Sequence, residues 1–505
     1  MIVALAALVA SIAFVPLDDR PVTAELPVML GRIAGVRVET PPSAMLGHYL
    51  TPGRPDSIVV WLNRRAADPQ TRAFVVSSDM LAYGGLLASR VPGTTYADAY
   101  FRLEELSHLR GERPGTWIAS FGTVMRLAPT GVPATAQYFA PYPVWSYIQQ
   151  YANLHDPPLP SEAARAEHLR QLIGEPTLEA YLATRGRNLS VDRYLLGLAA
   201  NGTLDRLVLG QDDAGPIGLH VKEVAWLQSV VAQDPQMMQR AAIEPGADEL
   251  GMALVAHAIA REARWVPHVA VRYSTPGGAA FQDPLEFAPV SSAIDGLVRL
   301  CGGVLDDAHP DVTLFVRLPR TTAAQDDAFA AEIGSEVDAG RSVALADLSY
   351  LASYASQAAF AARILSSGSA AKLDAYASWN TNANTVGTAL AEAVAAGAGR
   401  RMHTYDALAH RTFTFVRFVD DYAYHDFIRP YLNAALDAQG VTDHTLLPPQ
   451  TAAASAERDR ALLWYRADSI LSMLYPGYHI AALSIGLPWD RTFETSVDVG
   501  IAPDI

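Results

Sequence analysis

The sequence predicts an α/β fold on a parallel sheet: a (β/α)8-barrel-like domain with insertions, followed by a smaller C-terminal subdomain. From residue 12 to about 390, short apolar segments rich in β-branched or aromatic residues alternate with longer amphipathic segments. Nearly continuous apolar runs are typical of strands covered on both faces, as parallel strands are. A repeated strand–helix alternation favours crossover connections and therefore a parallel sheet.

Nine segments are predicted as strands. They are residues 12–15, 36–39, 74–77, 117–120, 207–210, 269–272, 313–316, 343–346 and 374–377. Nine exceeds the eight strands of a barrel, so either one segment lies outside the barrel or the sheet is open. We favour the barrel because barrels accommodate long insertions, and residues 129–190 have the composition of one. Residues 58–61 also look strand-like but follow two capping residues, Asp56 and Ser57, which favours a helix.

Other segments have the spacing of amphipathic helices, and the character of the chain changes after residue 400. The predicted helices are residues 96–109, 161–172, 246–261, 356–365, 412–435 and 452–475. The last segment, 484–501, alternates apolar and polar residues like a short β pair. We therefore divide the chain into an apolar segment (1–11), an α/β catalytic domain (12–400) and a C-terminal subdomain (401–505), with the boundary near 393–399.

Composition narrows the classes of partner. Of 505 residues, half are apolar and 18% are charged, which provides a large core. The net charge of −15 argues against a nucleic-acid or anionic-membrane partner. No segment has about 18 uninterrupted apolar residues, so no integral membrane span is expected. The single cysteine, Cys301, excludes an intramolecular disulfide framework and a thiolate metal site.

The first eleven residues leave the compartment open. They form an uncharged apolar run with small residues near its end, as before a signal-peptide cleavage site. A signal peptide normally begins with Lys or Arg, which this run lacks, so a buried opening helix fits equally well. Export to the periplasm and a cytoplasmic location both remain open.

Acidic and polar residues follow five of the predicted strands. These residues are Asp18, Asp19 and Arg20; Asp79 and Tyr83; Asp212 and Asp213; Asp347; and Trp379, Asn380 and Asn382. In a parallel α/β fold the carboxyl ends of the strands lie on one rim, where ligands bind. A single Asp or Asn there often only caps the next helix. A cap needs only one carboxylate, so the two Asp doublets weaken that reading.

Asp212 and Asp213 are therefore the leading catalytic candidates, with Asp79 in support. Neighbouring carboxylates repel, which raises one pKa and leaves the other group ionised, as general acid–base chemistry requires. The same division between the two carboxylates would also suit a metal site. Glu249 joins the substrate-binding candidates if its loop folds over the rim, whereas the helix dipole explains Asp248.

The remaining candidates are assigned to substrate binding. Asp18, Asp19 and Arg20 would either hold hydroxyl groups or form an ion pair that stiffens the first turn. Amides such as Asn380 and Asn382 offer a donor and an acceptor together, which matches vicinal hydroxyls, although Asn also marks turns. Tyr83 and Trp379 would stack on a sugar ring, and Asp347 ends a strand on the same rim.

Several familiar signatures are missing from the sequence. There is no phosphate-binding G-x-x-x-x-G-K-[ST], dinucleotide-binding G-x-G-x-x-G, G-x-S-x-G elbow or zinc-binding H-E-x-x-H. Nucleotide-driven enzymes, serine hydrolases and zinc proteases are thereby disfavoured.

Five segments together resemble one bacterial family. They are VPLDDRPV (15–22), SSDMLAYGGLLASR (77–90), LGQDDAGP (209–216), PGADELG (245–251) and YASWNTNANTVGTALA (376–391). The family is known as domain of unknown function number 4127, and the resemblance covers nearly the whole chain. It implies neither an activity nor catalytic residues. The order of an Asp pair and a later Trp-Asn segment is also loosely similar to barrel hexosaminidases.

Three functions remain open. The first is a glycosidase-like hydrolase that acts on a small-molecule or oligosaccharide substrate through strand-end carboxylates, with no cofactor. The second is a hydrolase assisted by Mg²⁺ or Mn²⁺, with Asp18, Asp79, Asp212 and Asp347 as oxygen ligands. The third is a non-catalytic carbohydrate-binding protein.

Overall fold

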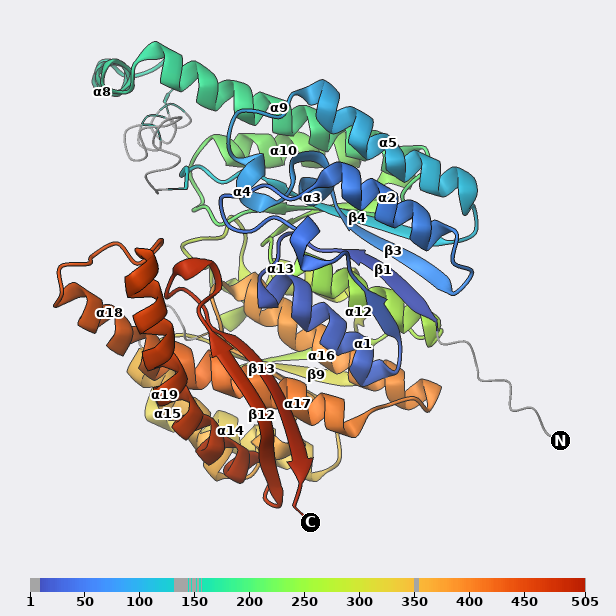
Figure 1. The fold of residues 1–505 in the computed structure, drawn as a ribbon, viewed down its shortest axis with the longest axis vertical. Helices are drawn as coiled ribbons and strands as arrows, with labels where there is room; N and C mark the ends of the chain where they lie inside the picture. The colour runs from blue at the N-terminus through green and yellow to red at the C-terminus, as the bar shows by residue number, and fades with distance from the viewer. Residues whose placement is uncertain are drawn as a thin grey trace.

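The strands form two parallel sheets with a layer of helices between them (Figure 1). The computed structural model describes residues 10–130, 157–348 and 354–504, together with 144, 147, 151, 154 and 155. The first sheet, in spatial order, contains β2 (Arg37–Glu39), β1 (Ser11–Val15), β3 (Thr71–Ser77), β4 (Trp117–Val124), β5 (Arg206–Gln211) and β6 (Ala241–Pro245). The second contains β11 (Ala375–Ala377), β10 (Val343–Asp347), β9 (Val312–Arg317), β7 (His268–Tyr273) and β8 (Val304–Leu305).

The α/β class and the parallel pairing are confirmed, and every predicted strand overlaps an observed one. The barrel prediction is replaced by two open sheets: among the described residues, β6 ends the first sheet and β7 belongs to the second. Both sheets follow the same order, in which the first strand lies between the second and the third. Such sheets bind ligands beyond the carboxyl ends of their strands, where the strand order reverses.

Helices cover both faces of each sheet, which explains the nearly continuous apolar strands. Between the sheets lie α1 (Leu26–Ala34), α12 (Leu250–Glu262), α13 (Val290–Leu300) and α16 (Asn382–Met402). The outer face of the first sheet carries α2 (Pro55–Ala66), α3 (Ser78–Tyr83), α5 (Tyr96–Glu112), α9 (Glu175–Ala200) and α10 (Leu219–Ala232). The outer face of the second carries α14 (Ala323–Asp338), α15 (Tyr354–Ser366), the π-helical segment η6 (Phe418–Ile428) and α19 (Pro449–Leu474).

Alternate strand residues enter different cores, as the two-residue period of a strand requires. Ile12 and Phe14 of β1 face the central core between the sheets, whereas Ala13 and Val15 face the outer core of the first sheet.

The remaining helices are α4 (Leu86–Ser89), α8 (Pro160–Ile173), α11 (Pro235–Arg240), α17 (Ala407–Arg417), α18 (Arg429–Asp437) and the short η1 (Pro21–Glu25), η2 (Ser43–Met45), η3 (Gly278–Ala280), η5 (Ala370–Lys372) and η7 (Pro488–Asp490).

The C-terminal part packs against both sheets' helices and ends in an antiparallel hairpin, β12 (Tyr478–Gly486) and β13 (Ser496–Pro503). The hairpin therefore agrees with the β pair expected for the tail. The boundary expected near 393–399 falls inside helix α16. Residues 58–61 lie within α2, as the capping residues indicated.

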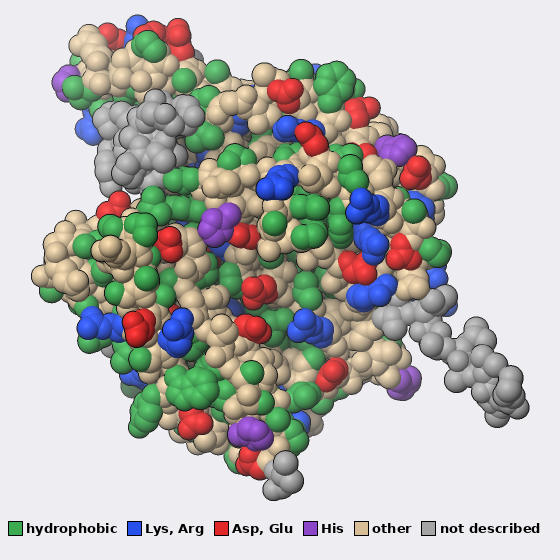
Figure 2. Space-filling model, viewed as in Figure 1, with side chains coloured by type: hydrophobic (Ala, Val, Ile, Leu, Met, Phe, Trp, Pro, Cys, Tyr) green, Lys and Arg blue, Asp and Glu red, His purple; other side chains and the backbone are tan. Residues whose placement is uncertain are grey.

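The N-terminal segment and the expected absence of a membrane span are the two remaining sequence expectations. Residues 1–9 of the apolar N-terminal segment lie outside the described residues, and Ser11 begins the buried strand β1. Within the described ranges, none of the helices has the length and apolar character needed to cross a membrane. On the face shown in Figure 2, Lys and Arg side chains are interspersed with Asp and Glu.

Candidate functional site

A polar cavity of about 230 Å³ opens where the carboxyl ends of the two sheets meet. Segments after all six strands of the first sheet supply its lining. The segment after β11 of the second sheet, Thr445 and the loop between β12 and β13 complete it. The charged and amide residues that line it are Arg20, Arg90, Arg126, Asp212, Asp213, Asp248, Asn380, Asn384 and Arg491. The aromatic residues are Tyr49, Trp489 and Phe493.

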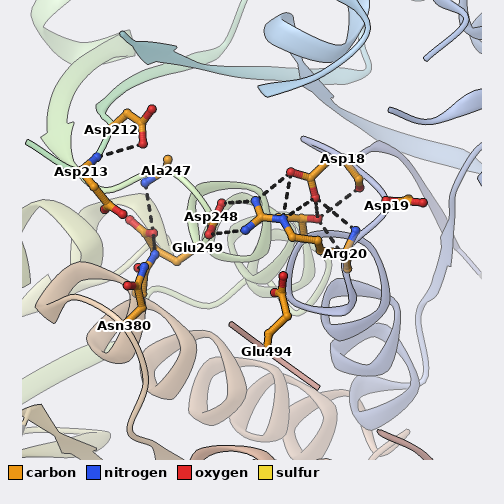
Figure 3. A network of polar contacts seen from close by, with 12 residues as sticks. Asp18, Asp19, Arg20, Asp212, Asp213, Ala247, Asp248, Glu249, Asn380 and Glu494 are labelled. Atoms are coloured by element: carbon orange, nitrogen blue, oxygen red, sulfur yellow. Dashed lines mark hydrogen bonds and ion pairs between the residues drawn. The ribbon is translucent and has the colours of Figure 1, made fainter. Parts of the chain in front are cut away.

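Arg20 is held by a buried ion network at one side of the cavity (Figure 3). Its Nη2 lies 2.7 Å from Asp18 Oδ2 and 2.6 Å from Asp248 Oδ1. Asp18 also accepts a hydrogen bond from the Thr23 hydroxyl at 2.6 Å. These bonds occupy both Asp18 oxygens, so Asp18 orients Arg20. Asp248, which the sequence analysis explained by the helix dipole alone, is instead the second counter-ion of Arg20.

Asp19 points away from this network (Figure 3) and anchors an aromatic wall. It accepts a 2.7 Å hydrogen bond from Trp489 Nε1 and faces His48 Nδ1 at 2.7 Å. The Trp489 ring lies under the Arg20 guanidinium, 4.7 Å from its centroid, and 5.1 Å from the Tyr49 ring. The two carboxylates of the first doublet therefore have different partners. Asp18 binds the Arg20 guanidinium, and Asp19 binds the Trp489 indole beneath it.

Asp212 and Asp213 have contrasting surroundings at the end of β5. Asp212 is buried in an ion pair with Arg90, and its Oδ1 accepts the Asp213 backbone N–H at 2.9 Å. Asp213 is half-buried and forms no ion pair within the described residues. Burial raises the pKa of Asp213 to about 7, with the charges of Asp212 and Asp248 adding to the effect. At neutral pH the two carboxyls therefore include one ion-paired group and one that readily carries a proton.

An amide wall closes the opposite side of the cavity. Asn380 Nδ2 donates to Asn384 Oδ1 at 2.6 Å, and Asn384 Nδ2 donates to the fully buried Glu249 at 2.6 Å. Burial raises the pKa of Glu249 well above its usual value. Gly246 has φ = 101°, and a Cβ atom there would lie 1.9 Å from Glu249 Oε1, so the loop after β6 requires glycine.

Residues 12–498 match the family described as "Protein of unknown function (DUF4127)". The chain belongs to this family. The suspected family resemblance is confirmed, and the matched span contains every residue that lines the cavity. No curated protein and no solved structure matches the chain.

Asp79 and Tyr83, two sequence-predicted site residues, lie behind the cavity wall. Asp79 is buried in the first turn of α3, and its Oδ2 has no hydrogen-bond partner among the described residues. Burial raises the pKa of Asp79 to about 7, although hydrogen bonding to Thr123 opposes the shift. The Tyr83 ring is covered by the Arg187 guanidinium at 4.5 Å, so it does not offer a face to the cavity.

Three further predicted residues lie elsewhere. Trp379 is buried and its indole N–H donates to the Thr388 hydroxyl at 3.1 Å, which leaves no exposed ring face for stacking. Asn382 begins α16 and is buried, while Asn384 of the same segment lines the cavity. Asp347 ends β10 in a fully buried ion pair with Arg317 at 3.1 Å.

Three of the four carboxylates expected to bind a metal are held in ion pairs with three different arginines. Asp18 is engaged by Arg20, Asp212 by Arg90, and Asp347 by Arg317. Across the described ranges, no group of three or more His, Cys, Asp or Glu side chains has the arrangement of a metal site.

The sequence analysis missed several residues that line the cavity: Tyr49, Arg90, Arg126, Trp489, Arg491 and Phe493. Arg90 and Arg126 each lie in a segment that follows a predicted strand of the first sheet. Their positions in the sequence could therefore have indicated that they lie near the ends of the strands. The Trp489–Asp19 contact spans 470 positions of sequence, and no local pattern indicates it.

Proposed function

We propose that this protein is a carbohydrate-active hydrolase of the glycosidase type. Asp213 acts as the general acid that protonates the leaving oxygen. Asp212 is the ionised carboxylate that stabilises the positive charge developing on the sugar, either electrostatically or as a nucleophile.

The contrast between two carboxyls at one strand end carries this proposal. Asp212 is ion-paired with Arg90, whereas the pKa of Asp213 is raised to about 7 by burial and by neighbouring carboxylates. Glycoside hydrolysis needs such a pair, with one protonated and one ionised group beside the scissile bond. Asp248 also lines the cavity and forms an ion pair with Arg20, so it is the second candidate for the stabilising carboxylate if Asp212 lies too close to Asp213 for that role.

The rest of the cavity supports a sugar as the substrate. Water occupies ~30 Å³ per molecule, so a cavity of about 230 Å³ has room for one sugar ring. Asn380 and Asn384 line one side of the cavity, and the aromatic residues Tyr49 and Trp489 line another, with the Trp489 ring already covered by Arg20 and Arg491. Side-chain amides hydrogen-bond to hydroxyl groups, which a sugar supplies.

A panel of aryl glycosides and oligosaccharides, assayed with and without a chelator, tests the proposal. We expect turnover of at least one glycoside, insensitive to the chelator, and at least ~100-fold slower in Asp212→Ala. Circular dichroism and thermal melting would establish that the variant folds. Sugar binding without turnover would identify a binding protein instead, and chelator-sensitive turnover restored by Mg²⁺ would favour the metal-assisted alternative. Full activity in Asp212→Ala would contradict the assigned role.

A further inference from the structure

The cavity contains four arginines, and three of them have carboxylate partners. Arg20 is paired with Asp18 and Asp248, Arg90 with Asp212, and Arg491 with Glu494. These partners fix each guanidinium and neutralise most of its charge.

Arg126, the fourth arginine, differs from the others. Its Nε donates to the Ala128 carbonyl at 3.0 Å, and it forms no ion pair with any residue in the described ranges. Burial and the nearby Arg90 lower the pKa of Arg126 to about 10, against the opposing charges of Asp212 and Asp213, so the group is still a cation at neutral pH. A partly buried guanidinium without a fixed partner is costly unless an anion joins it.

Arg126 also lies at the junction of two cavities. It lines the polar cavity and a neighbouring cavity of about 500 Å³, and Asp213 is the other residue common to both. The neighbouring cavity is bordered mainly by small and apolar residues, including Ala214, Pro216 and Ile217. A group bound to Arg126 would therefore lie beside the proposed general acid, where the two parts of a glycoside meet.

We propose that Arg126 binds a singly charged anionic group of the substrate, so that the preferred sugar is acidic. This inference rests on the proposed function, because it treats the bound sugar as a substrate. The binding of an acidic sugar can nevertheless be tested without any turnover. The planar guanidinium matches a carboxylate or a sulfate ester, each of which accepts two parallel hydrogen bonds. Asp212, Asp213 and Asp248 border the same cavity and would repel a dianionic phosphate more strongly than a monoanion.

Calorimetry with free sugars tests this inference without requiring turnover. The probes are D-glucuronate, D-galacturonate, glucose 6-sulfate, glucose 6-phosphate and the neutral sugars D-glucose and D-galactose. We expect the wild-type protein to bind at least one monoanionic sugar roughly 10-fold to 100-fold more tightly than its neutral parent, the range of a charge-assisted hydrogen bond. Arg126→Gln should remove that preference, so that the variant binds an acidic sugar about as tightly as its neutral parent, and Arg126→Lys should keep part of it.

Arg193→Gln is the matched control, because Arg193 is exposed on α9 and lies outside both cavities. It should bind every probe as the wild type does. Equal binding of acidic and neutral sugars, equal weakening of both in Arg126→Gln, absence of binding by every monoanionic probe, or a preference for the phosphate would each overturn the inference. Selective acid binding in a protein that hydrolyses no glycoside would uphold it and reject the proposed hydrolase.

Discussion

Arg20 shows how single residues keep the site rigid. Its guanidinium bonds two buried carboxylates and covers the Trp489 ring, so one side chain links the end of β1, the loop after β6 and the C-terminal loop. Buried ion pairs add little net stability, but removal of one partner leaves an uncompensated charge in the interior.

Replacement of Arg20 by Met should therefore destabilise the protein. The substitution keeps an apolar stem but leaves Asp18 and Asp248 without their counter-ion, which costs about 3–5 kcal/mol in the free energy of unfolding at pH 7. Urea denaturation measures the change. Arg37→Met removes an ion pair of a half-exposed arginine and should cost less than about 1 kcal/mol. Equal effects of the two variants would contradict the account of the Arg20 network.

Asp79→Asn tests whether Asp79 has a structural or a catalytic role. The pKa of Asp79 is raised to about 7 by burial, so its neutral form resembles the amide of Asn. We expect the variant to match the wild type in stability near pH 4 and to be more stable at pH 6 and above, because above pH 4 the unfolded wild type ionises while folded Asp79 keeps its proton up to about pH 7. Turnover should stay within about tenfold of wild type, because Asp79 does not line the cavity. A loss of turnover as large as that of Asp212→Ala would show that Asp79 takes part in catalysis.

At this scale the sequence indicated the charged strand ends but not their partners. The doublets at 18–19 and 212–213 do reach the site region, because strand ends of a parallel sheet share one edge. Trp379, expected to stack on a sugar ring, has its indole buried against α16. Which aromatic ring faces a cavity depends on packing that sequence spacing alone does not specify.

The loop between β12 and β13 completes the site at the level of elements. It brings Trp489, Arg491 and Phe493 to the ends of the first sheet, although among the described strands β12 and β13 pair only with each other. The Trp489 N–H bond to Asp19 fixes this loop against the segment after β1.

Trp489→Phe should loosen that attachment. The variant keeps an aromatic ring but leaves Asp19 without its indole donor, which should cost about 1–3 kcal/mol in the free energy of unfolding and weaken sugar binding. Urea denaturation and calorimetry measure the two effects. Trp464 is exposed on α19, so Trp464→Phe should change stability by less than about 0.5 kcal/mol. If both variants behave alike, the Trp489–Asp19 bond does not hold the loop.

The two strands that the sequence analysis missed have weak local signals. β6 reads AAIEP, in which Glu244 and Pro245 obscure an otherwise apolar alternation. β8 has two residues, both exposed. Most of the strands that were predicted, such as β1, β4, β9 and β10, are buried along their whole length, and their apolar composition identifies them.

Across the whole molecule, the division into two sheets could not be read from the sequence. A barrel and two open sheets share the same alternation of strands and helices, and they differ only in which strands become neighbours. Here the central helices α12 and α16 are almost entirely buried, because each is covered by a sheet on one side and by the other helix. Helices that are apolar all round indicate such a buried layer.

Buried carboxyls should make the stability of the whole chain fall as pH rises above neutrality. Burial raises the pKa to about 7 in Glu244 and Asp459, to about 8 in Glu286 and to about 9 in Asp426. Their unfolded values are near 4, so the unfolded state releases these protons first, and stability that is complete below pH 4 is lost as the pH rises through 7 to 9.

The measurement is urea denaturation at pH 6.5 and pH 9. Burial lowers the pKa of His220 and His257 to about 4, so these residues reduce stability only as the pH falls below 6.5 and do not affect this window. We expect the free energy of unfolding to fall by on the order of a few kcal/mol, since one pKa unit corresponds to about 1.4 kcal/mol. A constant or rising value would contradict the buried, protonated state of these carboxyls.

The leaving-group dependence of Asp213→Asn tests the central claim most directly. In the wild type, kcat/KM on a glycoside with a poor leaving group should fall as the pH rises through about 7, where Asp213 loses its proton. Asp213→Asn should lose roughly 10²–10⁴-fold on that substrate, but far less on a dinitrophenyl glycoside, which needs no proton to depart. Equal losses on both substrates, or a variant as active as the wild type, would show that Asp213 is not the acid.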